Sequence, residues 1–239
     1  MRSNRSTWRV AAGTACALLA LGVGPARASF IDTTAPWDHK TGAGPFGDST
    51  TSKSKHAAST YGQTFTVGPT DTALNNFSFW LHDSKKNGPL TVEAVVMQWN
   101  GHQAVGPALW TSSPMTTSTK KGMQQLTFNT GGLGLKPGTQ YVAFLTTSPF
   151  ASDAGHSAKV GYTKQDPYGQ GGFVYINNGS DMSKLTTTNW HHAPNGRDLA
   201  FRANLVNPAQ TPVPSGLLLG VIGSGSLLAT AWRGRRKKA

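Results

Sequence analysis

Apolar and polar residues alternate in short stretches through the middle of the chain, from residue 60 to residue 206. In residues 74–81, Phe77, Phe79 and Leu81 share one face, and the residues between them share the other. Residues 91–99 repeat this two-residue period, with Val95 and Met97 on one face. Successive side chains of a strand point to opposite faces of a sheet, so the period predicts β-strands. No apolar pattern at helical spacing extends beyond two turns in this region.

Nine such stretches are bounded by Gly, Pro, Asn or Asp at a spacing typical of sandwiches. We therefore expect an all-β domain, built as a two-sheet antiparallel β-sandwich. The stretch 133–144 contains the pattern L-x-P-G-T-x-Y and resembles β-sandwich and jelly-roll modules of secreted bacterial proteins, which implies a jelly-roll-like arrangement. No internal repeat is visible, which disfavours propellers and solenoids. The predicted strands are 61–67, 74–81, 90–99, 108–111, 124–129, 141–147, 158–162, 173–177 and 199–205.

The segment 29–59, ahead of the first predicted strand, is polar and rich in Gly. It has no strong strand pattern, so we expect a loosely packed N-terminal arm that precedes the sandwich domain, residues 60–206.

The first residues have the pattern of a secretory signal peptide. Residues 1–9 are positively charged, residues 10–24 are apolar, and Ala26 and Ala28 supply the small residues that a signal peptidase requires. Cleavage after Ala28 would make Ser29 the new N-terminus. A buried helix is an alternative, but neither a polar face nor a helix cap is present. A lipoprotein signal on Cys16 is weaker, because the large aliphatic residue usual in such signals is missing.

The other end of the chain has three parts. A Pro-rich stretch, 207–214, precedes an uncharged and mostly apolar segment, 217–232, and a basic cluster follows. Sixteen helical residues span about 24 Å, which becomes sufficient to cross a bilayer when the flanking residues lie at the interface. The basic residues favour the cytoplasmic side, so the body of the protein is expected outside that membrane. They are Arg233, Arg235, Arg236, Lys237 and Lys238.

This tail resembles the PEP-CTERM protein-sorting signal in its Val-Pro-x-Pro variants. The resemblance covers 211–238 and departs from the family where its central Glu is Val213. It implies an exported, membrane-anchored precursor in a Gram-negative bacterium and processing by an exosortase-like enzyme. A simple tail anchor without cleavage is the alternative. The short motif consists of Pro212, Val213, Pro214, Ser215 and Gly216. The expected segments are signal peptide 1–28, arm 29–59, sandwich 60–206, linker and sorting motif 207–216, transmembrane helix 217–232 and cytoplasmic tail 233–239.

The charge follows this division of the chain. The 239 residues carry a formal net charge of +12, from 22 Lys and Arg against 10 Asp and Glu. Nine of the basic residues lie in the two terminal segments, and 13 remain in the middle with all ten acidic residues. We therefore expect no nucleic-acid partner. The only cysteine, Cys16, lies in the predicted signal peptide, so the mature chain has no thiol chemistry and no disulfide.

Candidate catalytic chemistry is sparse, and we assign no catalytic residue, metal or cofactor. Glu93 is the only glutamate, and its pairing with Asp83 in a glycosidase-like site is a weak alternative. No G-x-S-x-G elbow occurs. His191 and His192 would face opposite ways on a strand, so they share a metal only if they lie in a loop. Residues 177–181 offer oxygen donors to calcium, but Asn-Gly is first a turn signal.

Aromatic residues are the strongest functional signal of the middle region. Sugar rings stack on aromatic planes, while their hydroxyls bond to polar neighbours. We therefore predict a glycan-binding surface formed by Trp110, Tyr168, Tyr175 and Trp190. The expected function is that of a non-catalytic cell-surface or matrix protein that binds exopolysaccharide. An assembly subunit of the envelope, whose sheet edges pair with neighbours, and an envelope glycan hydrolase are the alternatives.

Overall fold

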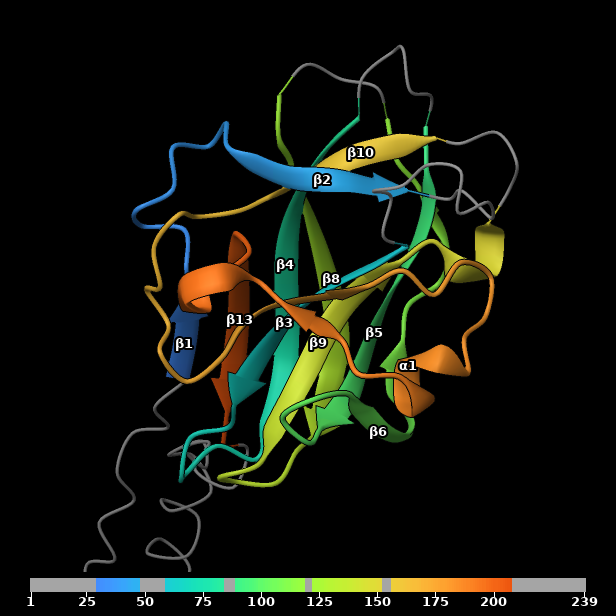
Figure 1. Ribbon diagram of the computed structural model, residues 1–239. Helices are drawn as coiled ribbons and strands as arrows, with labels where there is room; N and C mark the ends of the chain where they lie inside the picture. The colour runs from blue at the N-terminus through green and yellow to red at the C-terminus, as the bar shows by residue number, and fades with distance from the viewer. Residues whose placement is uncertain (1–28, 48–58, 84–88, 119–121, 152–155, 208–239) are drawn as a thin grey trace, which may run out of the picture. The chain divides into compact units, whose positions relative to one another are not determined.

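The computed structural model describes residues 29–47, 59–83, 89–118, 122–151 and 156–207. These residues form two antiparallel β-sheets and only short helical turns (Figure 1). The turns are η1 (Ser148–Phe150), α1 (Lys184–Thr187) and η2 (Pro194–Gly196). The all-β class expected from the alternation is therefore confirmed for the described part of the chain.

The first sheet is centred on the long strand β4, which pairs with three neighbours. Its strand order is β1, β13, β4, β10 and β2, and β8 also pairs with β4. In Figure 1, β2 and β10 lie side by side across the end of β4. The bounds are β1 (Ser29–Asp32), β2 (Gly42–Gly47), β4 (Ala73–Asp83), β8 (Gln124–Gly134), β10 (Ser157–Gly161) and β13 (Phe201–Val206).

The second sheet has the order β12, β11, β3, β9, β5 and β6, and β7 pairs with β5. Its centre is formed by β3, β9 and β5, and β3 pairs with β9 over the whole length of both strands. The bounds are β3 (Thr60–Thr66), β5 (Thr91–Trp99), β6 (Ala104–Thr111), β7 (Met115–Thr116), β9 (Gln140–Thr146), β11 (Gly172–Ile176) and β12 (His191–His192).

The main core lies between the two sheets, as in a β-sandwich. Phe65 of β3 and Phe201 of β13 come from different sheets, and their ring centroids are 6.1 Å apart. Phe77 and Phe79 of β4 extend this core, and all four side chains are fully buried. The burial follows the alternation of the sequence, because the residues between these phenylalanines point to the outer faces.

Each sheet also has a covered patch on its outer face. On the second sheet, Val95, Met97 and Trp99 form a cluster with Leu185 and Trp190 from the segment that includes α1. On the first sheet, Trp80 is covered by Trp37 of the segment after β1, with ring centroids 5.7 Å apart. The sequence predicts which residues share a face, but not that these outer faces are covered.

All nine predicted strands are present, with ends shifted by a few residues. The expected loose arm at 29–59 is wrong for residues 29–47. These residues contain β1 and β2, and Trp37 and Phe46 within them are buried. The sandwich domain of the described chain therefore begins at residue 29.

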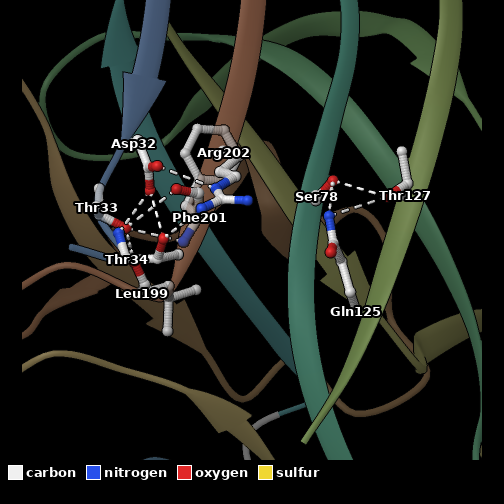
Figure 2. Close-up of polar contacts among 9 residues, drawn as sticks. All are labelled: Asp32, Thr33, Thr34, Ser78, Gln125, Thr127, Leu199, Phe201 and Arg202. Carbon is white, nitrogen blue, oxygen red and sulfur yellow. Dashed lines mark hydrogen bonds and ion pairs between the residues drawn. The ribbon is translucent and has the colours of Figure 1, made fainter. Parts of the chain in front are cut away.

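Polar contacts explain why β1 is fixed to β13 (Figure 2). Arg202 Nε donates to the Asp32 carboxylate at 3.0 Å, and the Thr34 backbone N–H donates to the same group at 2.8 Å. Desolvation by burial is the largest single influence on the pKa of Asp32 and raises it. The hydrogen bonds from Thr34 and Arg202, together with the charge of Arg202, outweigh desolvation, so the pKa is lowered. Phe201 N–H donates to Thr33 Oγ1 at 2.8 Å. In the same sheet, the hydroxyls of Ser78 on β4 and Thr127 on β8 are hydrogen-bonded to each other at 2.9 Å.

Among the residues that the structure describes, none lies in a helix long and apolar enough to cross a membrane. The predicted signal peptide, the sorting motif 212–216, the helix 217–232 and the basic tail 233–239 lie outside the described residues. Of the residues at the predicted cleavage site, Ser29 is described, and Ala26 and Ala28 are not.

Candidate ligand-binding groove

A groove of about 550 Å³ lies on the outer face of the second sheet. Thr64 and Thr66 of β3 line it, and they alternate with the core residue Phe65, so they point away from the core. Its volume lies in the range of small-ligand sites. The other lining residues are Trp99, Gly101, Gln140, Gly169, Gln170, Gly171, Gly172, Phe173, His192, Ala193 and Gly196.

One wall of the groove is the glycine-rich loop 169–172, which lies directly against β3. Gly172 N–H donates to Thr64 Oγ1 at 2.9 Å, and Thr66 Oγ1 donates to the Gln170 carbonyl at 2.9 Å. A Cβ atom at Gly171 would lie 1.9 Å from the Thr64 carbonyl oxygen. Only glycine fits at this position, so the close approach of loop and strand depends on it.

The base of this loop is anchored by the buried carboxylate of Asp198. It accepts a hydrogen bond from Gln63 Nε2 at 2.6 Å and another from the Tyr168 backbone N–H at 3.0 Å. Burial raises the pKa of Asp198 to about 7, although both hydrogen bonds act in the opposite direction. The nearby charge of Asp166 raises it further. The loop is thus connected to β3 through a titratable group.

The opposite wall is aromatic. Trp99, which is 4% exposed, and His192 line the groove with ring centroids 6.0 Å apart, and Trp190 packs edge to face against Trp99 at 5.4 Å. Trp190 is 3% exposed, and its Nε1 donates to the Leu185 carbonyl at 3.0 Å. Trp190 therefore supports this wall and presents no free ring face to a ligand.

The four predicted glycan-binding residues do not form one surface. Trp190 and Tyr168 both lie next to the groove as supports, and the Tyr168 hydroxyl donates to the Thr66 carbonyl at 3.1 Å. Trp110 is half-buried against Phe77 in the main core. Tyr175 packs against the same core and stacks on His191 at 5.2 Å. We therefore correct the predicted surface: the ring of Trp190 is covered, and Trp110 and Tyr175 lie away from the groove lining.

The groove offers neutral polar groups. Among the described residues that line the groove there is no Asp, Glu, Lys or Arg. Gln140, Gln170 and Thr66, together with the backbone of the glycine-rich loop, supply donors and acceptors. Such groups form hydrogen bonds with the hydroxyls of an uncharged ligand. Sequence reasoning missed Gln140 and considered His192 only as a metal ligand, and the signal available for the loop was the run Asp166–Gly172.

The carboxylates weighed for hydrolysis lie on different sheets. Asp83 ends β4, is 2% exposed and accepts a hydrogen bond from the Thr117 hydroxyl. Glu93 lies on β5, on the outer face of the second sheet. Burial raises the pKa of both groups. Neither lines the groove.

The other polar candidates have structural contacts. His191 and His192 form β12 and contact different aromatic residues, Tyr175 and Trp99. Asn178 of the 177–181 turn is buried, accepts from Thr60 Oγ1 at 2.8 Å and donates to Ser148 Oγ at 2.6 Å. Within the described ranges, no three His, Cys, Asp or Glu residues gather as a metal site would require.

Comparison with known proteins adds little to this picture. A scan against protein-family models and a search of curated proteins both find no match. Among solved structures, the chain is similar to the cysteine protease and lectin-like domains of Cwp84, a surface layer associated protein of Clostridium difficile. The TM-score is 0.39 at 11% identity, and the match covers 62% of this chain and 32% of that one. This chain therefore spans about a third of that structure, and a similarity of this size supports no argument about function.

Proposed function

We propose that the protein is an exported, non-catalytic β-sandwich protein of the cell surface or extracellular matrix that binds exopolysaccharide in the groove. Its precursor is cut after Ala28 by signal peptidase and held in the membrane by the helix 217–232. A PEP-CTERM-like tail is then processed by an exosortase-like enzyme. The composition of the two terminal segments supports this route. We also expect these segments to be helical and the strand arrangement to be jelly-roll-like.

The neutral polar lining of the groove is the observation that carries the ligand assignment. Sugars present many hydroxyls and apolar C–H faces, and the groove combines amides, hydroxyls and backbone groups with the largely buried Trp99. The support of its two walls by Tyr168 and Trp190 keeps these groups in place without the ligand. A preformed site of this kind limits the entropy lost on binding.

The test uses the mature exported chain and the polysaccharide of the host. We expect the tryptophan fluorescence to change on binding, because Trp99 lines the groove. His192→Ala and Gln140→Ala should each weaken binding by about tenfold, the loss of one or two hydrogen bonds. His191→Ala is the matched control, since that ring faces Tyr175 instead of the groove. Equal binding by His192→Ala and His191→Ala would refute the assignment of the groove.

The two alternative functions predict other results. An assembly subunit would form oligomers that depend on concentration and would ignore the polysaccharide. In such a subunit the N-terminal arm would be the segment donated to a neighbour. In the described part this arm is paired with β13 of its own chain, where Ser29 lies opposite Leu205. A glycan hydrolase would turn over the polysaccharide and lose that activity on Asp83→Asn or Glu93→Gln. The separation of these carboxylates on two sheets favours binding without hydrolysis.

A further inference from the structure

Among the buried carboxylates that the structure describes, that of Asp71 has no hydrogen-bond partner. Asp71 lies in the loop 67–72 between β3 and β4 and is 0% exposed. Neither carboxylate oxygen has a hydrogen-bond partner, whereas the other buried aspartates, Asp83 and Asp198, accept hydrogen bonds from neighbouring side chains. An ionised carboxylate removed from water without a partner is strongly destabilising. A cation or a set of hydrogen-bond donors beside Asp71 would remove this penalty.

The space beside Asp71 is shared with Ser29. A Cβ atom placed on Gly68 would lie 2.6 Å from Asp71 Oδ2 and 3.9 Å from Ser29 Oγ. Both side chains therefore border the same small space next to Gly68. A larger residue at position 68 would fill it.

The sheet places the amino end of Ser29 at this loop. Both β1 and β4 pair antiparallel with β13, so they run in the same direction and start at the same end of the sheet. Leu205 of β13 lies opposite both Ser29 and Leu74. The loop that carries Asp71 enters β4 at that end, and the contacts of Asp32 with Arg202 hold β1 there (Figure 2).

We propose that Asp71 binds the α-ammonium group of Ser29, which forms when the signal peptide is removed. This inference rests on the proposed export and on cleavage after Ala28. Hydrolysis of the Ala28–Ser29 bond consumes one water molecule, leaves a carboxylate on Ala28 and gives Ser29 a protonated amine. The uncut chain has one neutral N–H at this position. The mature chain has three donors and a positive charge, which is what Asp71 lacks.

Removal of the signal peptide therefore stabilises the folded domain by giving Asp71 its counter-ion. Before cleavage Asp71 has no counter-ion, and after cleavage it is half of an ion pair. Lys136 is another candidate counter-ion, because it follows Leu135, whose N–H donates to the carbonyl of Thr72, the residue after Asp71, at 2.8 Å. The side chain of Lys136 is exposed, so it is tested separately.

The experiment compares the mature chain with a precursor kept uncut by Ala28→Phe, each with and without Asp71→Asn. We expect Asp71→Asn to lower the Tm of the mature chain by about 2 to 4 °C, and to raise that of the precursor. Acetylation of the mature N-terminus should lower Tm in the wild type and leave Asp71→Asn unchanged. Two variants serve as controls: Asp38→Asn, at an exposed site, and Lys136→Gln. In each of them acetylation should lower the Tm as much as it does in the wild type.

A second readout needs no unfolding. The pKa of the Ser29 amine, followed by NMR of the isotopically methylated N-terminus, should be higher in the folded mature chain than in urea. That difference should vanish in Asp71→Asn. An equal rise in Tm on Asp71→Asn in both forms would overturn the proposal. So would a calcium-induced rise in Tm that requires Asp71 and ignores acetylation, since it would assign the site to a divalent cation.

N-terminal sequencing separates the two ideas. A mature chain that begins at another residue would overturn both the predicted cleavage and the role of Asp71. A chain that begins at Ser29 without coupling to Asp71 would overturn only the second.

Discussion

Replacement of Asp198 by Asn tests how the loop beside the groove is anchored. Burial raises the pKa of Asp198 from 3.8 to about 7. Between these pH values the folded protein holds a proton that the unfolded chain has released. The stabilisation that comes from this bound proton is fully present below the pKa of the unfolded chain, 3.8. It declines as the pH rises and is gone above about 7. Each pH unit is worth about 1.4 kcal/mol, so the loss over three units is about 4 kcal/mol.

The assay is urea unfolding of the mature chain from pH 4 to pH 8, followed by tryptophan fluorescence. We expect the free energy of unfolding to fall across this range in the wild type and to fall much less in Asp198→Asn. A small slope should remain, because burial also raises the pKa of Asp83 and Glu93. At pH 4 the variant should be less stable by about 1 to 3 kcal/mol, because the amide group of Asn can accept only one of the two hydrogen bonds.

Asp38→Asn is the control for this measurement. The pKa of Asp38 is lowered to about 2, chiefly by the hydrogen bond from the Thr41 backbone N–H, so this group stays ionised throughout the range. The control should therefore keep the wild-type slope. If Asp198→Asn also keeps that slope, the reasoning about the buried carboxylate is wrong.

Three further variants test other parts of the account. Gly171→Ala should displace the glycine-rich loop from the Thr64 carbonyl that it touches and abolish polysaccharide binding. Gly134→Ala, on β8 away from the groove and with no atom within 4 Å of its Cβ position, should bind normally in the fluorescence titration. Phe201→Ala should lower the free energy of unfolding by about 3 to 5 kcal/mol, and Phe30→Ala, at a 59% exposed position, by less than about 0.5 kcal/mol in urea titrations. Asn178→Ala should lower it by about 1 to 3 kcal/mol with no response to calcium, and a calcium-dependent Tm in the wild type would contradict the structural role assigned to this turn.

The strands could be predicted from the sequence because alternation is a local signal. Phe77 and Phe79 occupy the core face of β4 as their spacing indicates. The first strand had no such signal. It has four residues and is held by Asp32 and Arg202, which lie far apart in the sequence. A pairing of this kind depends on the completed sheet and leaves no periodic pattern near residue 29.

The groove was harder to predict than the fold. The aromatic residues indicated a binding surface, but Trp190 is buried because the segment that includes α1 covers the outer face of β5. The wall formed by residues 169–172 consists largely of backbone, and a glycine-rich run gives no side-chain pattern to read. Its closeness to Thr64 follows only from the pairing of β11 with β3.

The intact mass of the protein recovered from its native host, measured separately in the cytosolic, membrane and extracellular fractions, tests the account most directly. The account predicts a chain that begins at Ser29, lacks the apolar segment 217–232 and the basic tail, and is found outside the cytoplasmic membrane. A full-length chain that begins at Met1 and remains soluble in the cytosol would contradict it.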